Sequence, residues 1–143
     1  MSLPSFEPSG DLPEGLHQAP LTEFLARFGS STPQRERIAW RLRQAFDLVR
    51  PLGIISRVII WGSFVTAKPD PADADILWVT LPHFERRHLP VQVEVLFEPV
   101  LVKRLYGIDV LSIPEHSAFL PTLLDGLSIT RTFTRRGLVE VRL

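Results

Sequence analysis

Two short patterns within "GSFVTAKPDPADAD", residues 62–75, bring residue types that bind phosphate close to residue types that bind metal. The first pattern is Gly62-Ser63, and the second is the carboxylate pair Asp73-x-Asp75. In an extended strand, residues two apart project from the same face, so we expect Asp73 and Asp75 to point together. Two carboxylates held that close repel each other unless a cation or a shared proton compensates their charge.

A metal-bound nucleoside triphosphate would satisfy both patterns. Mg²⁺ prefers oxygen ligands and keeps positions open for phosphate oxygens, which suits a pair of carboxylates. Gly62 would let a phosphate approach the backbone closely, and the amide and hydroxyl of Ser63 can donate hydrogen bonds to its oxygens. The spacing therefore predicts a site for Mg²⁺, or for the similar Mn²⁺, with a triphosphate as substrate.

The elements that must position these residues are two apolar runs, which we interpret as buried strands over residues 55–61 and 74–81. Before them, residues 30–51 form the clearest helix, with Ser31 or Thr32 as its cap and a proline in its first turn. Its expected buried stripe consists of Ile38, Leu42, Ala45, Phe46 and Val49. Arg37 and Arg41 lie outside this stripe, and we interpret them as a solvated basic face rather than as a nucleic-acid contact.

The rest of the chain divides into an extended N-terminal arm over residues 1–19 and a single domain over residues 20–143. Residues 94–106 fit either a strand or a helix, and we favour a helix from about Phe97 to a stop at Gly107. The other predicted elements are a helix over 20–29, a polar loop over 83–92, a strand over 108–113, a helix over 117–126 and a strand over 137–143. This pattern predicts an α/β (α+β) fold, a small mixed sheet with helices packed mainly on one side.

Composition limits the remaining possibilities. A chain of 143 residues with 45% hydrophobic residues suits one globular domain with a modest core. The chain has 16 basic and 16 acidic residues, so its net charge does not favour a polyanionic partner. The absence of cysteine excludes disulfides and thiolate metal sites and agrees with a reducing compartment, so we expect a cytoplasmic protein. No apolar run approaches the ~18 residues of a membrane span.

The segment 62–75 resembles the signature of the DNA-polymerase-β-like nucleotidyltransferase superfamily, in which Gly-Ser is followed, after a loop, by Asp-x-Asp or Asp-x-Glu. The nearer similarity is to small, mostly uncharacterised bacterial nucleotidyltransferase-like proteins. It covers nearly the whole chain and is carried by "LPEGLHQAPLTEFLARFG", "GSFVTAKP", "LYGID" and "RRGLVEV". The resemblance implies a minimal nucleotidyltransferase fold. It also implies transfer of a nucleoside monophosphate from a metal-bound triphosphate to a hydroxyl acceptor.

The resemblance further implies a two-metal site with a third carboxylate from a later strand, and the matching position is Asp109. Asp109 would bind the second metal or assist deprotonation of the acceptor hydroxyl. Two alternatives stay open: Asp109 is only a polar residue at the start of a strand, or Glu94 is the third carboxylate. Lys68 and Arg136 are candidates to contact the triphosphate, although a lysine beside a proline is also commonly just solvated.

Three functions remain open at this point. The leading one is the minimal nucleotidyltransferase, acting on RNA, protein or a small molecule. The second is a nucleotide-binding regulator or toxin–antitoxin component with little turnover, and the third is a non-catalytic interaction module. Active superfamily members usually carry a further helical domain for the base or acceptor, and the residues that follow the predicted strand over 108–113 leave little room for one. A docked macromolecule, a partner protein or a homodimer would then have to complete the site, or the activity has been lost.

Overall fold

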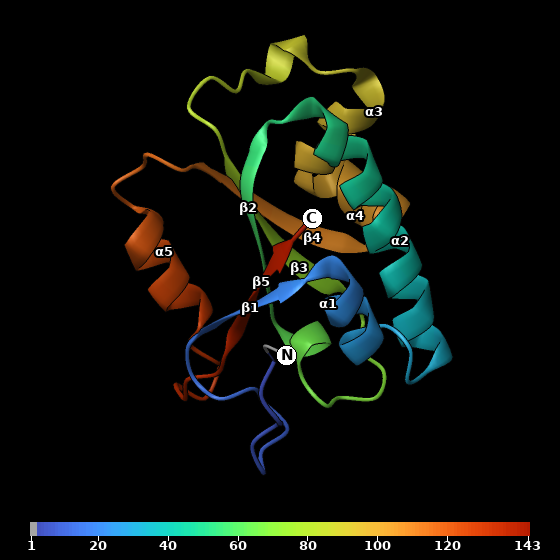
Figure 1. The fold of residues 1–143 in the computed structure, drawn as a ribbon, viewed down its shortest axis with the longest axis vertical. Coiled ribbons are helices and arrows are strands. Elements are labelled where there is room, and N and C mark those ends of the chain that lie inside the picture. The colour runs from blue at the N-terminus through green and yellow to red at the C-terminus, as the bar shows by residue number, and fades with distance from the viewer. Residues whose placement is uncertain (1–2) are drawn as a thin grey trace.

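A mixed five-stranded sheet forms the centre of the computed structural model, which describes residues 3–143 (Figure 1). In chain order the strands are β1 (Leu16–Pro20), β2 (Ile55–Trp61), β3 (Ala74–Thr80), β4 (Ile108–Pro114) and β5 (Leu138–Arg142). Across the sheet their order is β1-β5-β2-β3-β4. The pairs β1–β5 and β3–β4 are parallel, and β2 is antiparallel to both of its neighbours. The expected small mixed sheet is confirmed.

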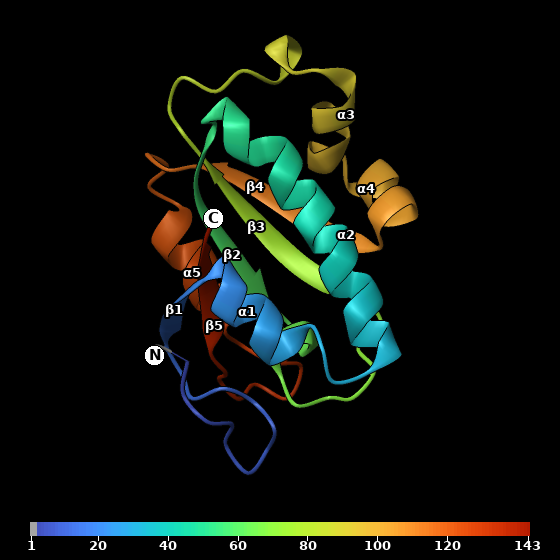
Figure 2. The ribbon, with the colours of Figure 1, turned by 45° about the vertical axis from the view of Figure 1, so that its right-hand side comes forward.

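Helices cover the two faces of this sheet unequally (Figures 1 and 2). One face carries α1 (Leu21–Phe28), α2 (Pro33–Val49), α3 (Val91–Glu94) and α4 (Pro99–Tyr106), and the other carries α5 (Leu120–Leu127). The favoured helix within residues 94–106 is present as α4, and it begins slightly later than expected because Pro99 suits a first turn. Helices thus pack mainly on one side, as predicted.

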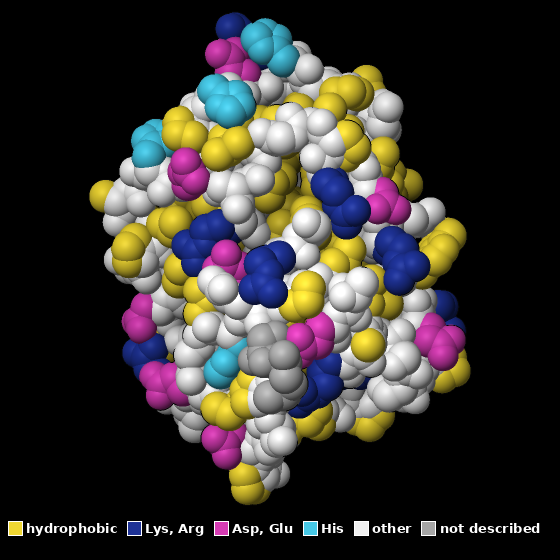
Figure 3. All heavy atoms as spheres, in the orientation of Figure 1, with side chains coloured by type: hydrophobic (Ala, Val, Ile, Leu, Met, Phe, Trp, Pro, Cys, Tyr) yellow, Lys and Arg dark blue, Asp and Glu magenta, His cyan; other side chains and the backbone are white. Residues whose placement is uncertain are grey.

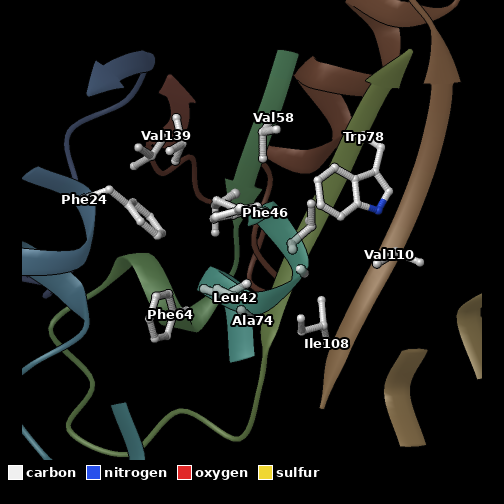
Figure 4. Packing of buried hydrophobic residues seen from close by; sticks show 14 of the residues in the cluster. Phe24, Leu42, Phe46, Val58, Phe64, Ala74, Trp78, Ile108, Val110 and Val139 are labelled. Atoms are coloured by element: carbon white, nitrogen blue, oxygen red, sulfur yellow. The ribbon is translucent and has the colours of Figure 1, made fainter. Parts of the chain in front are cut away.

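The larger core lies between the sheet and the first four helices (Figure 4). At its centre the fully buried Trp78 of β3 meets the ring of Phe46 edge-on, with centroids 6.0 Å apart. Its indole Nε1 donates a hydrogen bond to the carbonyl oxygen of Leu96 at 2.9 Å, so the one polar atom of the ring is satisfied. The predicted stripe of α2 is buried throughout, at Ile38, Leu42, Ala45, Phe46 and Val49.

A second, smaller core forms where α5 packs on the opposite face of the sheet. Leu77 and Val79 of β3 belong to it, together with Leu120 of α5. Because alternate residues of a strand face opposite ways, Ile76 and Trp78 point into the larger core instead. The strand β3 is therefore covered on both faces, which explains why its sequence is almost continuously apolar.

The N-terminal arm takes part in the sheet. Residues 16–20, predicted as the end of a free arm and the start of a helix, form the edge strand β1 and pair with β5. Leu3 and Leu12 of the same arm are buried in the larger core. Prolines and glycines interrupt the arm so often that no strand periodicity develops in its sequence.

The surface agrees with the balanced composition. On the face seen in Figure 3, basic and acidic side chains are interspersed and do not gather into one large patch of a single sign. Across residues 3–143, every helix is too short or too polar to cross a membrane.

Candidate active site

Three aspartates meet at the point where β3 and β4 begin. In the parallel register of these strands Asp75 and Asp109 are direct partners, and Asp73 immediately precedes β3. Carboxylate oxygens from the three residues lie within 4.8 Å of one another. Asp75 shares its face of β3 with Leu77 and Val79, which α5 covers, so the acidic cluster extends that face beyond the small core.

A lysine approaches this acidic cluster from α4. The Lys103 ammonium donates hydrogen bonds to Asp73 and, at 2.9 Å, to Oδ2 of Asp109. Gly107 ends α4 in the left-handed conformation, with φ of 66°, and this tight reversal brings the last turn of the helix back toward β4. Lys103 was not predicted as a site residue, because a lysine in the last turn of a helix is a common surface feature.

The pKa values of two aspartates of the cluster are shifted in opposite directions. Burial, followed by the charges of Asp73 and Asp109, raises the pKa of Asp75 to about 7, against the opposing effect of Lys103. Burial also acts to raise the pKa of Asp109, but the hydrogen bond from Lys103 and those shared with Asp73 and Asp75 outweigh it, so that this pKa is lowered. Three carboxylates thus lie around the ammonium of Lys103, which bonds two of them. An all-oxygen donor set with excess negative charge suits a hard divalent cation such as Mg²⁺ or Mn²⁺.

Gly62 is required by its contact with this cluster. Its φ is 81°, and a Cβ at this position would lie 2.1 Å from Oδ2 of Asp75. Only glycine therefore allows the end of β2 to lie against the carboxylate. The expected approach of a phosphate to Gly62 stays a prediction, and the close neighbour in the structure is Asp75.

A buried arginine binds the backbone of the loop that follows Gly62-Ser63. Arg35 of α2 is only 2% exposed, and its guanidinium donates at 2.7 Å to the carbonyl oxygens of Phe64, Thr66 and Lys68. Burial lowers the pKa of Arg35, while the charge of Asp70 opposes this. Sequence inspection did not single out Arg35, since no pattern distinguishes a buried arginine from the solvated ones on the same helix.

A pocket of about 760 Å³ opens in front of the cluster. One wall combines the acidic cluster with Gly62 and Ser63, and Trp61 and Lys68 border the same side. A shared pocket thus unites most of the predicted site residues. Its volume falls in the range of small-molecule sites, which is about 300–1,000 Å³.

The second wall comes from the segment that follows α5. Thr130, Thr132 and Thr134 line the pocket, and their hydroxyls contact one another, at 2.7 Å between Thr130 and Thr134. Arg131 lines it as well, as does Arg136, whose Nη1 lies 3.5 Å from Oδ1 of Asp11. The Nε atom of Arg136 is buried and has no hydrogen-bond partner within residues 3–143. Of this wall only Arg136 was predicted, because the wall depends on the chain folding back after α5.

A model of a protein family matches residues 4–142, nearly the full chain, under the description "Family of unknown function (DUF6932)". The chain belongs to the DUF6932 family. The search of curated proteins and that of solved structures gave no match. Both walls of the pocket lie inside the region that this family model matches.

The structure gives the positions of the candidate residues whose roles the sequence left open. Asp109 joins Asp73 and Asp75, whereas Glu94 ends α3 and belongs neither to the cluster nor to the pocket. Lys68 is exposed at the pocket edge, compatible with either interpretation, and Arg136 lines the opposite wall. Their roles toward a ligand stay predictions.

Proposed function

We propose that this DUF6932 protein is a metal-dependent nucleotidyltransferase, which moves a nucleoside monophosphate from a triphosphate to a hydroxyl acceptor. The observation that carries the proposal is the convergence of Asp73, Asp75 and Asp109 on the pocket wall that also presents Gly62 and Ser63. The paired strands β3 and β4 hold Asp75 and Asp109, and Asp73 directly precedes β3, so a rigid element fixes two of the three carboxylates.

Each residue has a defined task in this proposal. The three aspartates would hold Mg²⁺ or Mn²⁺, which would neutralise phosphate charge and stabilise the charge that develops during transfer. The Ser63 amide and hydroxyl would orient phosphate oxygens. The acceptor oxygen bonds to the α-phosphorus as the bond to pyrophosphate breaks, and the hydroxyl proton passes to a carboxylate. Asp109, ionised because of its lowered pKa, is our candidate for that acceptor side.

The wall after α5 supplies the surface for base and sugar that the sequence seemed to lack. The hydroxyls of Thr130, Thr132 and Thr134 offer hydrogen bonds, and Trp61 and Leu127 add apolar area. Hydroxyls both donate and accept, so they pair with any base edge. We therefore expect several triphosphates to bind with poor discrimination between bases.

Lys103 supports a second candidate, a nucleotide-binding regulator with little turnover. Its ammonium bonds two of the three carboxylates, so it competes with a divalent cation for the same oxygens. Weak metal binding would leave a pocket that holds triphosphate without transferring it. Release of pyrophosphate distinguishes the transferase from the regulator.

The test is a thermal-shift panel of the common nucleoside triphosphates, each with and without Mg²⁺ or Mn²⁺. A ligand that binds only the native state raises the melting temperature, and we expect this for triphosphate with metal. The double variant Asp73→Asn/Asp75→Asn should lose the increment. An equal shift in that variant would reject the metal site.

Pyrophosphate release is then measured on a second pair of variants. Asp109→Asn should leave the triphosphate-induced shift largely intact and suppress release. Glu94→Gln is the matched control and should release pyrophosphate like the wild type, because Glu94 lies outside the pocket. The opposite result would assign the third carboxylate to Glu94.

A further inference from the structure

A separate, smaller hollow lies between α2 and the segments that lead into β3 and β4. Its volume is about 250 Å³, and it shares no lining residue with the larger pocket. The residues that line it are Gln34, Arg37, Ile38, Arg41, Ala72, Tyr106 and Gly107. We call it the arginine pocket.

Two arginines give this pocket its charge. Arg37 and Arg41 lie one helical turn apart on α2, and among residues 3–143 no acidic side chain lines the pocket with them. Arg37 donates to the side-chain oxygen of Gln34 at 2.7 Å. For Arg41, residues 3–143 provide neither a hydrogen bond nor an ion pair. Its Nη1 lies 3.2 Å from where a Cβ of Gly107 would be, so the guanidinium lies close over the backbone that leads into β4.

The polar frame of the arginine pocket is fixed to the segment that precedes the acidic cluster. The Gln34 amide donates to the carbonyl oxygen of Pro71 at 3.0 Å and to that of Ala72 at 3.4 Å. These bonds tie the first turn of α2 to the chain that continues into Asp73. The arginines therefore have a defined position relative to the carboxylates.

The arginine pocket includes residues that come shortly before the acidic cluster in the sequence, at the starts of both β3 and β4. Ala72 immediately precedes Asp73, and Gly107 comes two residues before Asp109. The strands β3 and β4 start side by side, in parallel register. An anion in the arginine pocket would thus lie beside the segments that lead into Asp73 and Asp109, yet outside the larger pocket.

We propose that the arginine pocket binds a phosphate group of the acceptor and so brings a nearby hydroxyl of the same molecule to Asp109. Two guanidinium groups match the oxygens of a phosphate in number and geometry. The pocket has room for a phosphate or a phosphodiester with part of a sugar. Both the end of a nucleic-acid strand and a small phosphorylated alcohol carry this chemistry.

The proposed phosphate binding depends on the arginine pocket alone. The role of the bound molecule as acceptor rests on the proposed nucleotidyl transfer. The proposal departs from the expectation that Arg37 and Arg41 form a merely solvated face. That expectation followed from their position outside the apolar stripe of the helix, and sequence could not indicate the hollow between α2 and the start of β4.

The test compares Arg37→Gln/Arg41→Gln with Arg43→Gln. Arg43 is also exposed on α2 and unpaired within residues 3–143, but it lies at a different groove, so it controls for loss of surface charge. Glutamine keeps a good helix propensity at all three positions. Binding of a short fluorescein-labelled single-stranded RNA is measured by anisotropy over a range of salt, without metal or triphosphate, and glycerol phosphate serves as competitor.

We expect the wild type to bind the RNA and the double variant to bind it at least about tenfold more weakly, with a salt slope shallower by about one to two. Arg43→Gln should stay within about twofold of the wild type. Competition by glycerol phosphate would assign the site to small phosphorylated alcohols, and its failure would assign it to a polymer end. Wild-type affinity in the double variant, or an equal loss in Arg43→Gln, would overturn the proposal.

The thermal-shift panel separates this inference from the proposed function. The double variant should retain the full shift with triphosphate and metal, because neither arginine lines the larger pocket. A wild-type protein that binds phosphate through these arginines but shows no triphosphate shift would refute the transferase and leave the phosphate site standing. A normal triphosphate shift without arginine-dependent RNA or phosphate binding would refute the phosphate site alone.

Discussion

Replacement of Asp75 by asparagine should stabilise the protein without metal, and more strongly as pH rises. The folded-state pKa of Asp75 is raised to about 7 from the ordinary value of 3.8, firstly by burial. Between these values the unfolded chain has released the proton while the folded protein retains it. The unfolded state thus binds fewer protons, and stability falls as pH rises through this window. Asparagine cannot ionise and therefore avoids that loss.

The size of the effect follows from the width of the window. One pKa unit corresponds to about 1.4 kcal/mol, so the full shift sets an upper limit of about 4 kcal/mol above pH 7. Asp75 is partly exposed, and solvent screens the charges of Asp73 and Asp109. We therefore expect a gain of about 1–2 kcal/mol in the free energy of unfolding near pH 8 and almost none near pH 4. The asparagine amide can also donate to Asp109, as a protonated Asp75 would.

Urea denaturation with a chelator present, at several pH values between these limits, measures this difference. Asp47→Asn is the matched control, because Asp47 is exposed on α2 and unpaired within residues 3–143. A difference that does not vary with pH, or a variant less stable near pH 8, would refute the reasoning about burial and like charge. Excess Mg²⁺ should reverse the order, since only the wild type keeps the complete set of carboxylates.

Three further changes test other contacts of the site. Arg35→Met should lower the free energy of unfolding by about 3 kcal/mol or more, since several buried carbonyls lose their donor, and a loss below about 1 kcal/mol in urea denaturation would contradict this role. Gly62→Ala should destabilise by about 2 kcal/mol and clearly less in an Asp75→Ala background, where the clash is gone; equal losses in this double-mutant cycle would place the strain elsewhere. Lys103→Met should strengthen Mn²⁺ binding about tenfold in calorimetric titration by removing the competing ammonium, whereas unchanged affinity would mean that the two cations do not compete.

Local sequence patterns predicted those parts of the fold that depend on local periodicity. The stripe of α2 and the apolar runs of β2 and β3 report burial directly, because each face of a helix or strand repeats at a fixed interval. The pair Asp73 and Asp75 was predictable for the same reason, being two residues apart at the start of a strand. The edge strand β1 was not, since pairing with β5 more than a hundred residues away leaves no local signal.

The remainder of the site depends on contacts between distant segments. The place of Asp109 beside Asp75 follows from the register of β3 and β4, which the sequence implied only through a resemblance. Lys103 reaches the cluster because the chain reverses tightly at Gly107, and Arg35 binds buried carbonyl oxygens of a distant loop. Neither contact leaves a pattern in the sequence around these residues. The pocket wall formed by Thr130, Thr132 and Thr134, here called the threonine wall, requires α5 to pack on the opposite face of the sheet from α2.

The position of β5 in the sheet has a consequence for the order in which the protein forms during synthesis. Of the five strands of the sheet β5 is translated last, yet it lies between β1 and β2. Until it emerges from the ribosome, β1 has no strand partner and β2 keeps one open edge, a template on which nascent chains can associate. The acidic cluster needs only β3 and β4, so the nascent protein can assemble its carboxylates first. The threonine wall leads directly into β5, and the pocket therefore closes in the same step that protects the sheet from other chains.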